Sequence, residues 1–127
     1  MKTEGYQQKE HGMRVKRYVQ TMELKPDSAL IAAYRERHSE GAVWKEILAG
    51  IREVGILEME IYILGTRLVM IVDAPADFDW DTAMARLATL PRQQEWEEYM
   101  AEFQQCGKEA TSAEKWQLME RMFRLYE

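Results

Sequence analysis

Residues 56–74, ILEMEIYILGTRLVMIVDA, limit the possible folds of this chain more than any other stretch. The first half alternates in steps of two, which is the pattern of a β-strand. Its two faces carry Leu57, Met59, Ile61 and Ile63 and, opposite them, Glu58, Glu60, Tyr62 and Leu64. The short turn GTR then leads into residues 68–74, which are almost all apolar. We therefore expect a hairpin whose second strand is central in a sheet.

The remaining segments predict two further strands and four helices, from period-2 alternation and from helical spacing of apolar residues. The strands are expected over residues 13–24 and 115–126, a loop over 106–114, and the helices over 27–39, 44–55, 79–89 and around Trp96 to Phe103. This order is an elaborated β-α-β-β-α-β arrangement. The predicted fold class is α+β, with a ferredoxin-like four-stranded antiparallel sheet and helices on one face.

Such a sheet would leave its second face bare in a monomer. Every second side chain of each strand would lie on this face, so that the face would mix apolar and charged side chains. A second copy of the same sheet is the simplest partner, because one self-complementary surface then serves both subunits. We expect a two-fold homodimer through the sheet face, that is, a dimeric α/β barrel.

Length and charge narrow the function classes. The 127 residues fit one domain, with residues 1–12 as a flexible polar tail and residues 13–127 as the folded unit. The net charge of -5 would repel nucleic acid. We found no apolar run long enough for a membrane helix and no signal-peptide core, and Cys106 stands alone. These features predict a cytoplasmic protein that binds neither membrane nor nucleic acid.

The run AAYRERHSEGAVWKEI, residues 32–47, carries the first candidate chemistry. Tyr34 and His38 lie one helical turn apart on a face that also holds Leu30 and Ile31, so this face is expected to point inward. Spacing alone favours a buried structural histidine. The position of His38 near the helix end and beside a phenol favours a functional one, because imidazole can both give and take a proton near neutral pH.

Trp96 lies among carboxylates and amides in the run QQEWEEYM. An indole face beside hydrogen-bond acceptors is a common way to hold a sugar. A solvated acidic helix face explains Glu95, Glu97 and Glu98 equally well. The other tryptophans, and the methionines including Met59, are expected in the core. No HxxxH or CxxC spacing and no glycine-rich phosphate loop occurs, so neither a metal nor a cofactor is predicted.

Taken in order, YRERH, MEIYILGTRLVMIV, QEWEEYM and EKWQLMERMF resemble the L-rhamnose mutarotase family over residues 14–126. The resemblance implies a ferredoxin-like unit that dimerises through its sheet and interconverts the α and β anomers of a 6-deoxyhexose. By position, His38 is similar to the family's proton donor and Tyr34 to a sugar-binding tyrosine. Trp96 is similar to the first of two adjacent tryptophans.

Two positions depart from the rhamnose pattern. Glu97 stands where the second tryptophan is expected, and Met59 stands where a sugar-contacting tyrosine is expected. The resemblance implies that both residues bind the substrate, and that the changed side chains alter the selectivity for its hydroxyl groups. The motifs QEWE and MEIY look more like the branch of the family associated with L-fucose. The implied substrate is therefore a 6-deoxy-L-hexose, L-fucose or L-rhamnose, and the implied mechanism is general acid–base opening and closure of the ring by His38.

Two other functions fit the same residues. A cofactor-independent oxygenase or isomerase could use the same dimeric barrel, since fold does not fix function. A non-catalytic dimeric module that binds a small molecule would leave His38 with a structural role only. Glu97 beside Trp96 argues against the first of these, because a bulky apolar pocket would not need the acid.

Overall fold

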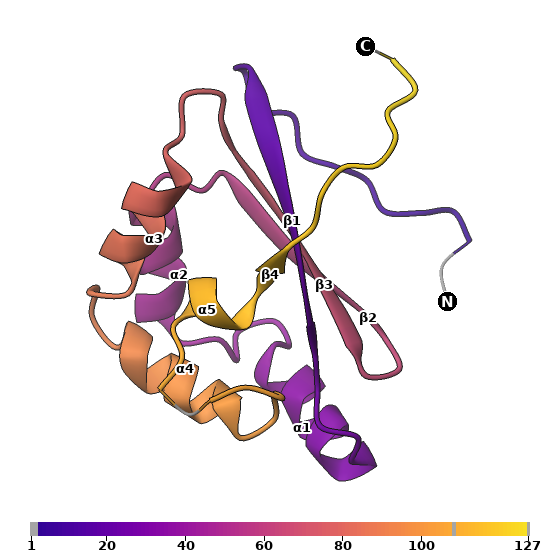
Figure 1. Cartoon of the computed structure of the whole chain (residues 1–127), viewed down its shortest axis with the longest axis vertical. Coiled ribbons are helices and arrows are strands. Elements are labelled where there is room, and N and C mark those ends of the chain that lie inside the picture. Colours follow the sequence, from indigo (N-terminus) through magenta and orange to yellow (C-terminus); the bar gives the residue numbers. More distant parts are fainter. Residues whose placement is uncertain (1–2, 108, 127) are drawn as a thin grey trace.

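A computed structural model describes residues 3–107 and 109–126 of the chain (Figure 1). Its elements in order are β1 (Val15–Glu23), α1 (Ser28–Arg37), α2 (Lys45–Glu53), β2 (Glu58–Leu64), β3 (Arg67–Pro75), α3 (Trp80–Leu87), α4 (Gln93–Ala101), α5 (Ser112–Lys115) and β4 (Gln117–Leu118). In the described residues the strands form one antiparallel sheet with the order β2-β3-β1-β4. The predicted α+β class and the four-stranded antiparallel sheet are confirmed.

The predicted hairpin forms, and its second strand is central because β3 pairs with both β2 and β1. Leu64 pairs with Arg67 across a two-residue turn in which Gly65 has a φ of 62°. Glycine adopts this left-handed conformation without the steric cost that a Cβ would bring. The turn sets the register, and with it the side chains of β2 that share a face.

Helices cover one face of the sheet, and Figure 1 shows α2, α3 and α4 together on that side with α1 at the lower end of β1. Tyr18 of β1 and Met59 of β2 both pair with Val72, which is buried. Residues paired side by side point to the same face, so Met59 points toward the helices. The core lies between this face and the helices, and its largest fully buried side chains are Leu24, Leu68, Val72 and Met100.

The helix that carries the candidate histidine starts and stops at predictable residues. The carboxylate of Asp27 accepts hydrogen bonds from the backbone N–H groups of Ala29 and Leu30, 3.0 Å each, and caps the first turn. The helix ends at Arg37, and His38 is its C-cap residue. The prediction of a helix over 27–39 is confirmed apart from its two ends.

The prediction of a last strand over residues 115–126 is wrong in extent. β4 contains only Gln117 and Leu118, which pair with β1. The N–H of Met119 donates to the carbonyl of Val19 at 2.7 Å, after which the chain leaves the edge of β1 (Figure 1). Alternating side chains favour an extended conformation, but a strand also needs a neighbouring edge, and the described residues offer none beside 120–126.

The prediction of a loop over residues 106–114 is wrong in part, because α5 begins at Ser112. The Thr111 hydroxyl accepts a hydrogen bond from the Glu114 N–H, while the Glu114 carboxylate accepts one from the Thr111 N–H. This reciprocal pair is a capping box, which starts a helix at the sequence TSAE. Lys108 of the predicted loop lies outside the described residues.

Residues 3–12 contain no helix or strand, and two of their side chains contact the face of the sheet opposite the helices. The rings of Tyr6 and Tyr62 are 5.8 Å apart, and His11 Nε2 is 4.0 Å from the Asp73 carboxylate. The flexibility predicted for the tail over 1–12 stays a prediction, and residues 1–2 lie outside the described residues. Within residues 3–107 and 109–126, no helix combines the length and apolar character needed to cross a membrane.

Candidate functional site

A cavity of about 350 Å³ lies between α1, α2, α4 and the covered face of the sheet. This size is in the range of small-molecule sites, roughly 300–1,000 Å³. The structure brings together on its wall all of the residues that the sequence singled out, namely Tyr34, His38, Met59, Trp96 and Glu97. They come from the end of α1, the start of β2 and the middle of α4.

His38 presents one ring nitrogen as a hydrogen-bond acceptor. Its Nδ1 lies 2.9 Å from the backbone carbonyl of Tyr34. A carbonyl only accepts, so Nδ1 carries the proton and Nε2 of the neutral ring holds the free lone pair. Burial lowers the pKa of His38 below its ordinary value of 6.5, against the opposing effects of the Tyr34 carbonyl and the Glu97 carboxylate. The imidazole is therefore neutral and basic at pH 7.

Tyr34 stays a protonated phenol. Its ring is 4.3 Å from the His38 ring, and the residue is 3% exposed. Burial raises the pKa of Tyr34 well above its ordinary value of 10. The Gln104 amide donates a hydrogen bond to the phenol oxygen at 3.3 Å. In the described part of the chain no acceptor takes the phenol's own proton, so this O–H is available as a donor.

Trp96 is held by other aromatic rings. Its ring stands edge-on to His38 at 5.7 Å and to Trp44 at 5.1 Å. Trp44 is stacked on Tyr99, with ring centroids 5.9 Å apart and an interplanar angle of 11°. Trp116, 4% exposed, confirms the expectation of a core tryptophan, and Trp44 packs half-buried against the core. The packing leaves Trp96 little freedom to change orientation.

Met59 belongs to the apolar part of the cavity. It is half-buried on β2. The apolar wall continues through Ile47, Ile51, Ile56, Ile61 and Met70. The expectation of a core position is therefore confirmed for Met59 and is wrong for Met119 and Met122, which are 50% and 96% exposed. The same contact surface is available to an apolar group of a ligand, such as a methyl.

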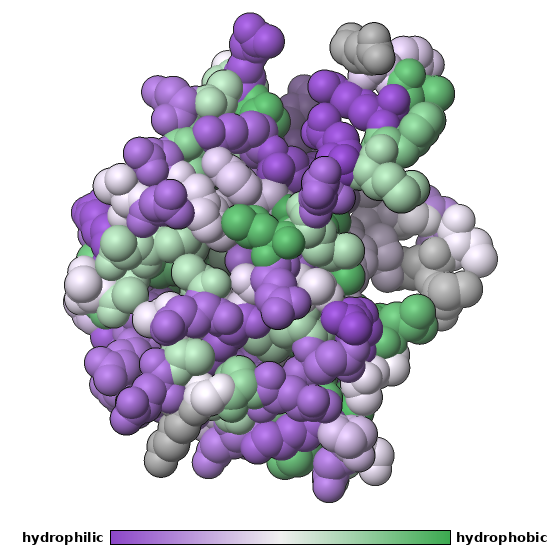
Figure 2. Space-filling view, viewed as in Figure 1, coloured by the Kyte–Doolittle hydropathy of each residue, from purple (hydrophilic) through white to green (hydrophobic). Residues whose placement is uncertain are grey.

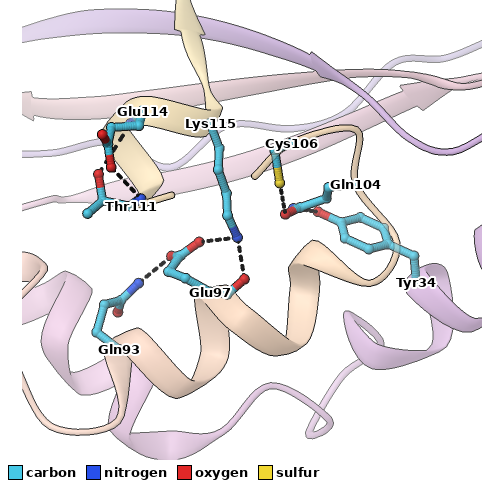
Figure 3. Close-up of polar contacts among 8 residues, drawn as sticks. All are labelled: Tyr34, Gln93, Glu97, Gln104, Cys106, Thr111, Glu114 and Lys115. Atoms are coloured by element: carbon cyan, nitrogen blue, oxygen red, sulfur yellow. Dashed lines mark hydrogen bonds and ion pairs between the residues drawn. The ribbon is translucent and has the colours of Figure 1, made fainter. Parts of the chain in front are cut away.

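Glu97 belongs to a buried polar cluster (Figure 3). Lys115 Nζ, on a side chain that is 0% exposed, lies 2.8 Å from Glu97 Oε1 and 2.5 Å from the Glu97 backbone oxygen. The amide of Gln93 donates to Glu97 Oε2 at 2.5 Å. The reading of Glu97 as part of a solvated helix face is therefore wrong, because α5 and the chain after it cover this part of α4.

The sequence did not predict a role for Gln93, Gln104 or Lys115. Two local signals point to part of this set. Gln93 and Glu97 are four residues apart on a helix, a spacing at which an amide reaches a carboxylate. The capping-box pattern TSAE predicts the helix that ends at Lys115. No local pattern pairs Gln104 with Tyr34, since the two are separated by 70 positions.

The walls of the cavity differ in chemistry. One part is apolar, one is formed by Trp96, and one by a neutral imidazole beside a phenol. The carboxylate of Glu97 adds an acceptor whose charge is balanced by Lys115. Such a site can hold a small molecule with hydroxyl groups on one side and an apolar group on the other, and can move a proton on it.

Comparisons with known proteins find relatives that match nearly the whole chain. The family model described as L-rhamnose mutarotase matches residues 17–125. An L-fucose mutarotase from Xanthomonas campestris is 38% identical over 115 residues, which cover 91% of this chain and 92% of that protein. The crystal structure of an L-rhamnose mutarotase from Formosa agariphila superposes with a TM-score of 0.64 at 21% identity, covering 87% of this chain and 98% of that one. This last likeness shows that the fold is shared.

The buried ion pair predicts a large loss of stability when its cation is removed. Lys115→Met leaves the Glu97 carboxylate in the interior without a positive partner, and we expect a loss of about 3–5 kcal/mol in the free energy of unfolding. Urea unfolding followed by tryptophan fluorescence measures it.

Arg86→Met is the matched control, because it breaks an ion pair of the same 2.7–2.8 Å length in which both side chains are 53% exposed. We expect the control to lose less than about 1 kcal/mol. Equal losses in the two variants would contradict the assignment of a buried, energetically coupled pair.

Proposed function

This chain belongs to the L-rhamnose mutarotase family, and from that premise we propose that it interconverts the α and β anomers of a 6-deoxy-L-hexose, L-fucose or L-rhamnose. As a member of the family it is an isomerase of the aldose 1-epimerase type. The observation that carries the proposal is the meeting of Tyr34, His38 and Trp96 on one cavity. A sugar ring stacked on the indole would place its anomeric centre near the imidazole and the phenol.

His38 moves the proton. Its Nε2 takes the proton of the anomeric hydroxyl, the bond between C1 and the ring oxygen breaks, and C1 becomes an aldehyde carbon. The ring oxygen keeps the bonding electrons and takes the proton back from the imidazolium. Rotation about the C1–C2 bond and the reverse steps close the ring on the other face. His38 is thus base and acid in turn, which agrees with its neutral resting state.

Tyr34 holds the ring oxygen. Its phenol proton is available, and its raised pKa keeps that proton in place during the reaction. A hydrogen bond from the phenol stabilises the negative charge that develops on the ring oxygen before His38 returns the proton. The other three residues bind the sugar without taking part in proton transfer. Trp96 covers one face of the sugar, Met59 packs against its apolar atoms, and Glu97 accepts a hydrogen bond from a hydroxyl group.

Two features support L-fucose as the preferred sugar. The L-fucose mutarotase of Xanthomonas campestris is similar to this chain over nearly its whole length. Glu97, with its charge balanced by Lys115, presents an acceptor at a position where the rhamnose pattern has an aromatic face. L-Fucose and L-rhamnose differ in which ring hydroxyls are axial, so exchanging a flat surface for an acceptor changes which of them is held.

We also propose a homodimer through the sheet face, closing a dimeric α/β barrel. The sheet has helices on one side only, and its other face is contacted by Tyr6 and His11 of the N-terminal segment. The segment after β4 projects from the body with apolar side chains in the open (Figure 2). Half or more of the surface is exposed for Leu118, Met119, Met122, Phe123, Leu125 and Tyr126. Contiguous exposed apolar residues of this kind favour a protein partner, and a second copy would cover both segments at once.

The mutarotase proposal predicts faster anomer exchange in the presence of the protein. Saturation-transfer NMR of the anomeric protons, with L-fucose, L-rhamnose and other aldoses, measures the exchange rate. We expect His38→Ala to reduce the catalysed rate by about 10²–10⁴-fold, because the proton shuttle is removed. The control is His11→Ala, which removes the other histidine of the sequence and is expected to keep the wild-type rate. Exchange no faster than in buffer for every sugar would refute the proposed function.

The role of His38 as a base predicts a direction for the pH dependence. The pKa of His38 lies below 6.5, so kcat/KM should be level above this pH and fall as the pH drops through the lowered pKa. The free energy of unfolding should change in the same direction. Below pH 6.5 His38 is protonated in the unfolded chain but still neutral in the folded one, so its contribution to stability, present above pH 6.5, is lost as the pH falls through the lowered pKa. Measuring kcat/KM and the midpoint of urea unfolding as the pH is lowered through and below 6.5 tests both predictions. A fall in activity with rising pH would contradict the assignment.

The dimer proposal predicts that a charge in the projecting segment weakens association. Size-exclusion chromatography with light scattering should give the mass of two chains for the wild type. Phe123→Glu should lower that mass toward one chain at the same protein concentration. Thr82→Glu, an exposed substitution on the helix side in α3, is the control and should leave the mass unchanged. A monomeric wild type, or a Phe123→Glu dimer as strong as the wild type, would contradict the proposal.

A further inference from the structure

Gln93 lines the cavity and carries an unpaired, buried polar atom. Among the described residues, its Oε1 is the buried side-chain atom that has no hydrogen-bond partner. The residue is 4% exposed and lines the same cavity as His38 and Trp96. Buried acceptors in folded proteins are almost always paired, and leaving one unpaired is costly. The atom therefore marks a place where a donor from outside the chain is expected.

The orientation of this amide is determined by its neighbours. Gln93 Nε2 donates to Glu97 Oε2 at 2.5 Å, and the ionised carboxylate can only accept. Turning the amide over would place two oxygens at hydrogen-bonding distance from each other. Lys115, fully buried and 2.8 Å from Glu97 Oε1, favours the charged carboxylate. The chain of contacts Lys115–Glu97–Gln93 thus leaves an acceptor, and not a donor, without a partner (Figure 3).

We propose that Gln93 is a further substrate-binding residue of this site: its Oε1 accepts a hydrogen bond from one ring hydroxyl of the sugar, and Lys115 is a positioning residue that acts on it through Glu97. The inference rests on the proposed function, because it takes the ligand to be a sugar. It adds a selectivity rule to that function. A hydroxyl satisfies Oε1, whereas a hydrogen, a methyl or a fluorine at the same carbon leaves it unpaired.

The test combines variants of the protein with analogues of the sugar. Wild type, Gln93→Met and Gln94→Met are compared on the preferred sugar and on its 2-, 3- and 4-deoxyfluoro analogues, since fluorine replaces the hydroxyl without a proton to donate. Gln94 is the matched control: it is the neighbouring amide on α4, it is exposed, and it bonds to Glu98 outside the cavity. The ratio of kcat/KM between parent sugar and analogue is measured by anomer exchange, each corrected for the uncatalysed rate.

We expect one analogue to lose about 5- to 50-fold in kcat/KM with the wild type and with Gln94→Met. With Gln93→Met the same analogue should lose less than about twofold, because the acceptor that required the hydroxyl is gone. For each of the other analogues, the loss of kcat/KM relative to the parent sugar should be the same with all three proteins. If every analogue loses the same factor with wild type and with Gln93→Met, the proposal is overturned and Oε1 is met by water alone.

The positioning role of Lys115 and Glu97 has its own readout. In Glu97→Gln the Gln93 amide can turn over, so that its Oε1 accepts a hydrogen bond from the new amide N–H. The acceptor is then satisfied within the protein, and the selectivity for the hydroxyl should vanish. A residue that only supports the fold would lower the rate on all analogues alike and leave their ratios unchanged. Near-UV circular dichroism establishes that the variant is folded. Unchanged ratios in a folded Glu97→Gln variant would overturn the positioning role.

Failure of the proposed function is a separate result. It appears as anomer exchange no faster than in buffer for every sugar with the wild type. The same panel is then titrated by tryptophan fluorescence, and the Kd ratios replace the kcat/KM ratios. A ratio that disappears in Gln93→Met supports the proposal for a binding site. Equal ratios, or no binding of any sugar, overturn it.

Discussion

The cavity depends on the buried contact between Lys115 and Glu97. The two residues come from α5 and α4, and their ion pair joins the C-terminal part of the chain to the helix that carries Trp96. A charge in the interior is tolerated only when an opposite charge and hydrogen bonds satisfy it, so both side chains must be present and in place. With the pair formed, Gln93 has one orientation, and the free hydrogen-bonding capacity of Gln93 Oε1 and the Glu97 carboxylate is that of acceptors.

Burial then determines the chemistry of the two titratable groups beside it. Removing water disfavours a charge on either group, so the histidine stays neutral and the tyrosine stays protonated. A basic nitrogen and a phenol that donates a hydrogen bond therefore lie on the same cavity without any net charge between them. This pairing suits a reaction that moves one proton between two oxygens of the same molecule. The fold contributes by holding both groups on the last turns of one helix.

Local patterns predicted much of this structure, for identifiable reasons. The hairpin and the helix that starts at Asp27 depend on neighbouring residues, on a turn glycine and on a cap. The last strand was predicted too long because alternation describes the two faces of a strand and not the edge that it needs. Helix α5 was not predicted, although the capping-box sequence TSAE indicates where it begins. Glu97 was left open between a solvated face and a sugar site, because burial of a helix face depends on what packs against it.

By itself, the sequence determined the order of the strands and of the four longer helices, the face of each strand that is apolar, and the presence of Tyr34, His38 and Trp96 on helical stripes. These properties follow from spacing, which is local. Only the tertiary structure decided that the three side chains meet with Glu97 on one cavity, and that Gln93 keeps an unpaired oxygen there. The physical reason is that burial and electrostatic pairing depend on distances between segments far apart in the chain, such as the 18 positions that separate Lys115 from Glu97.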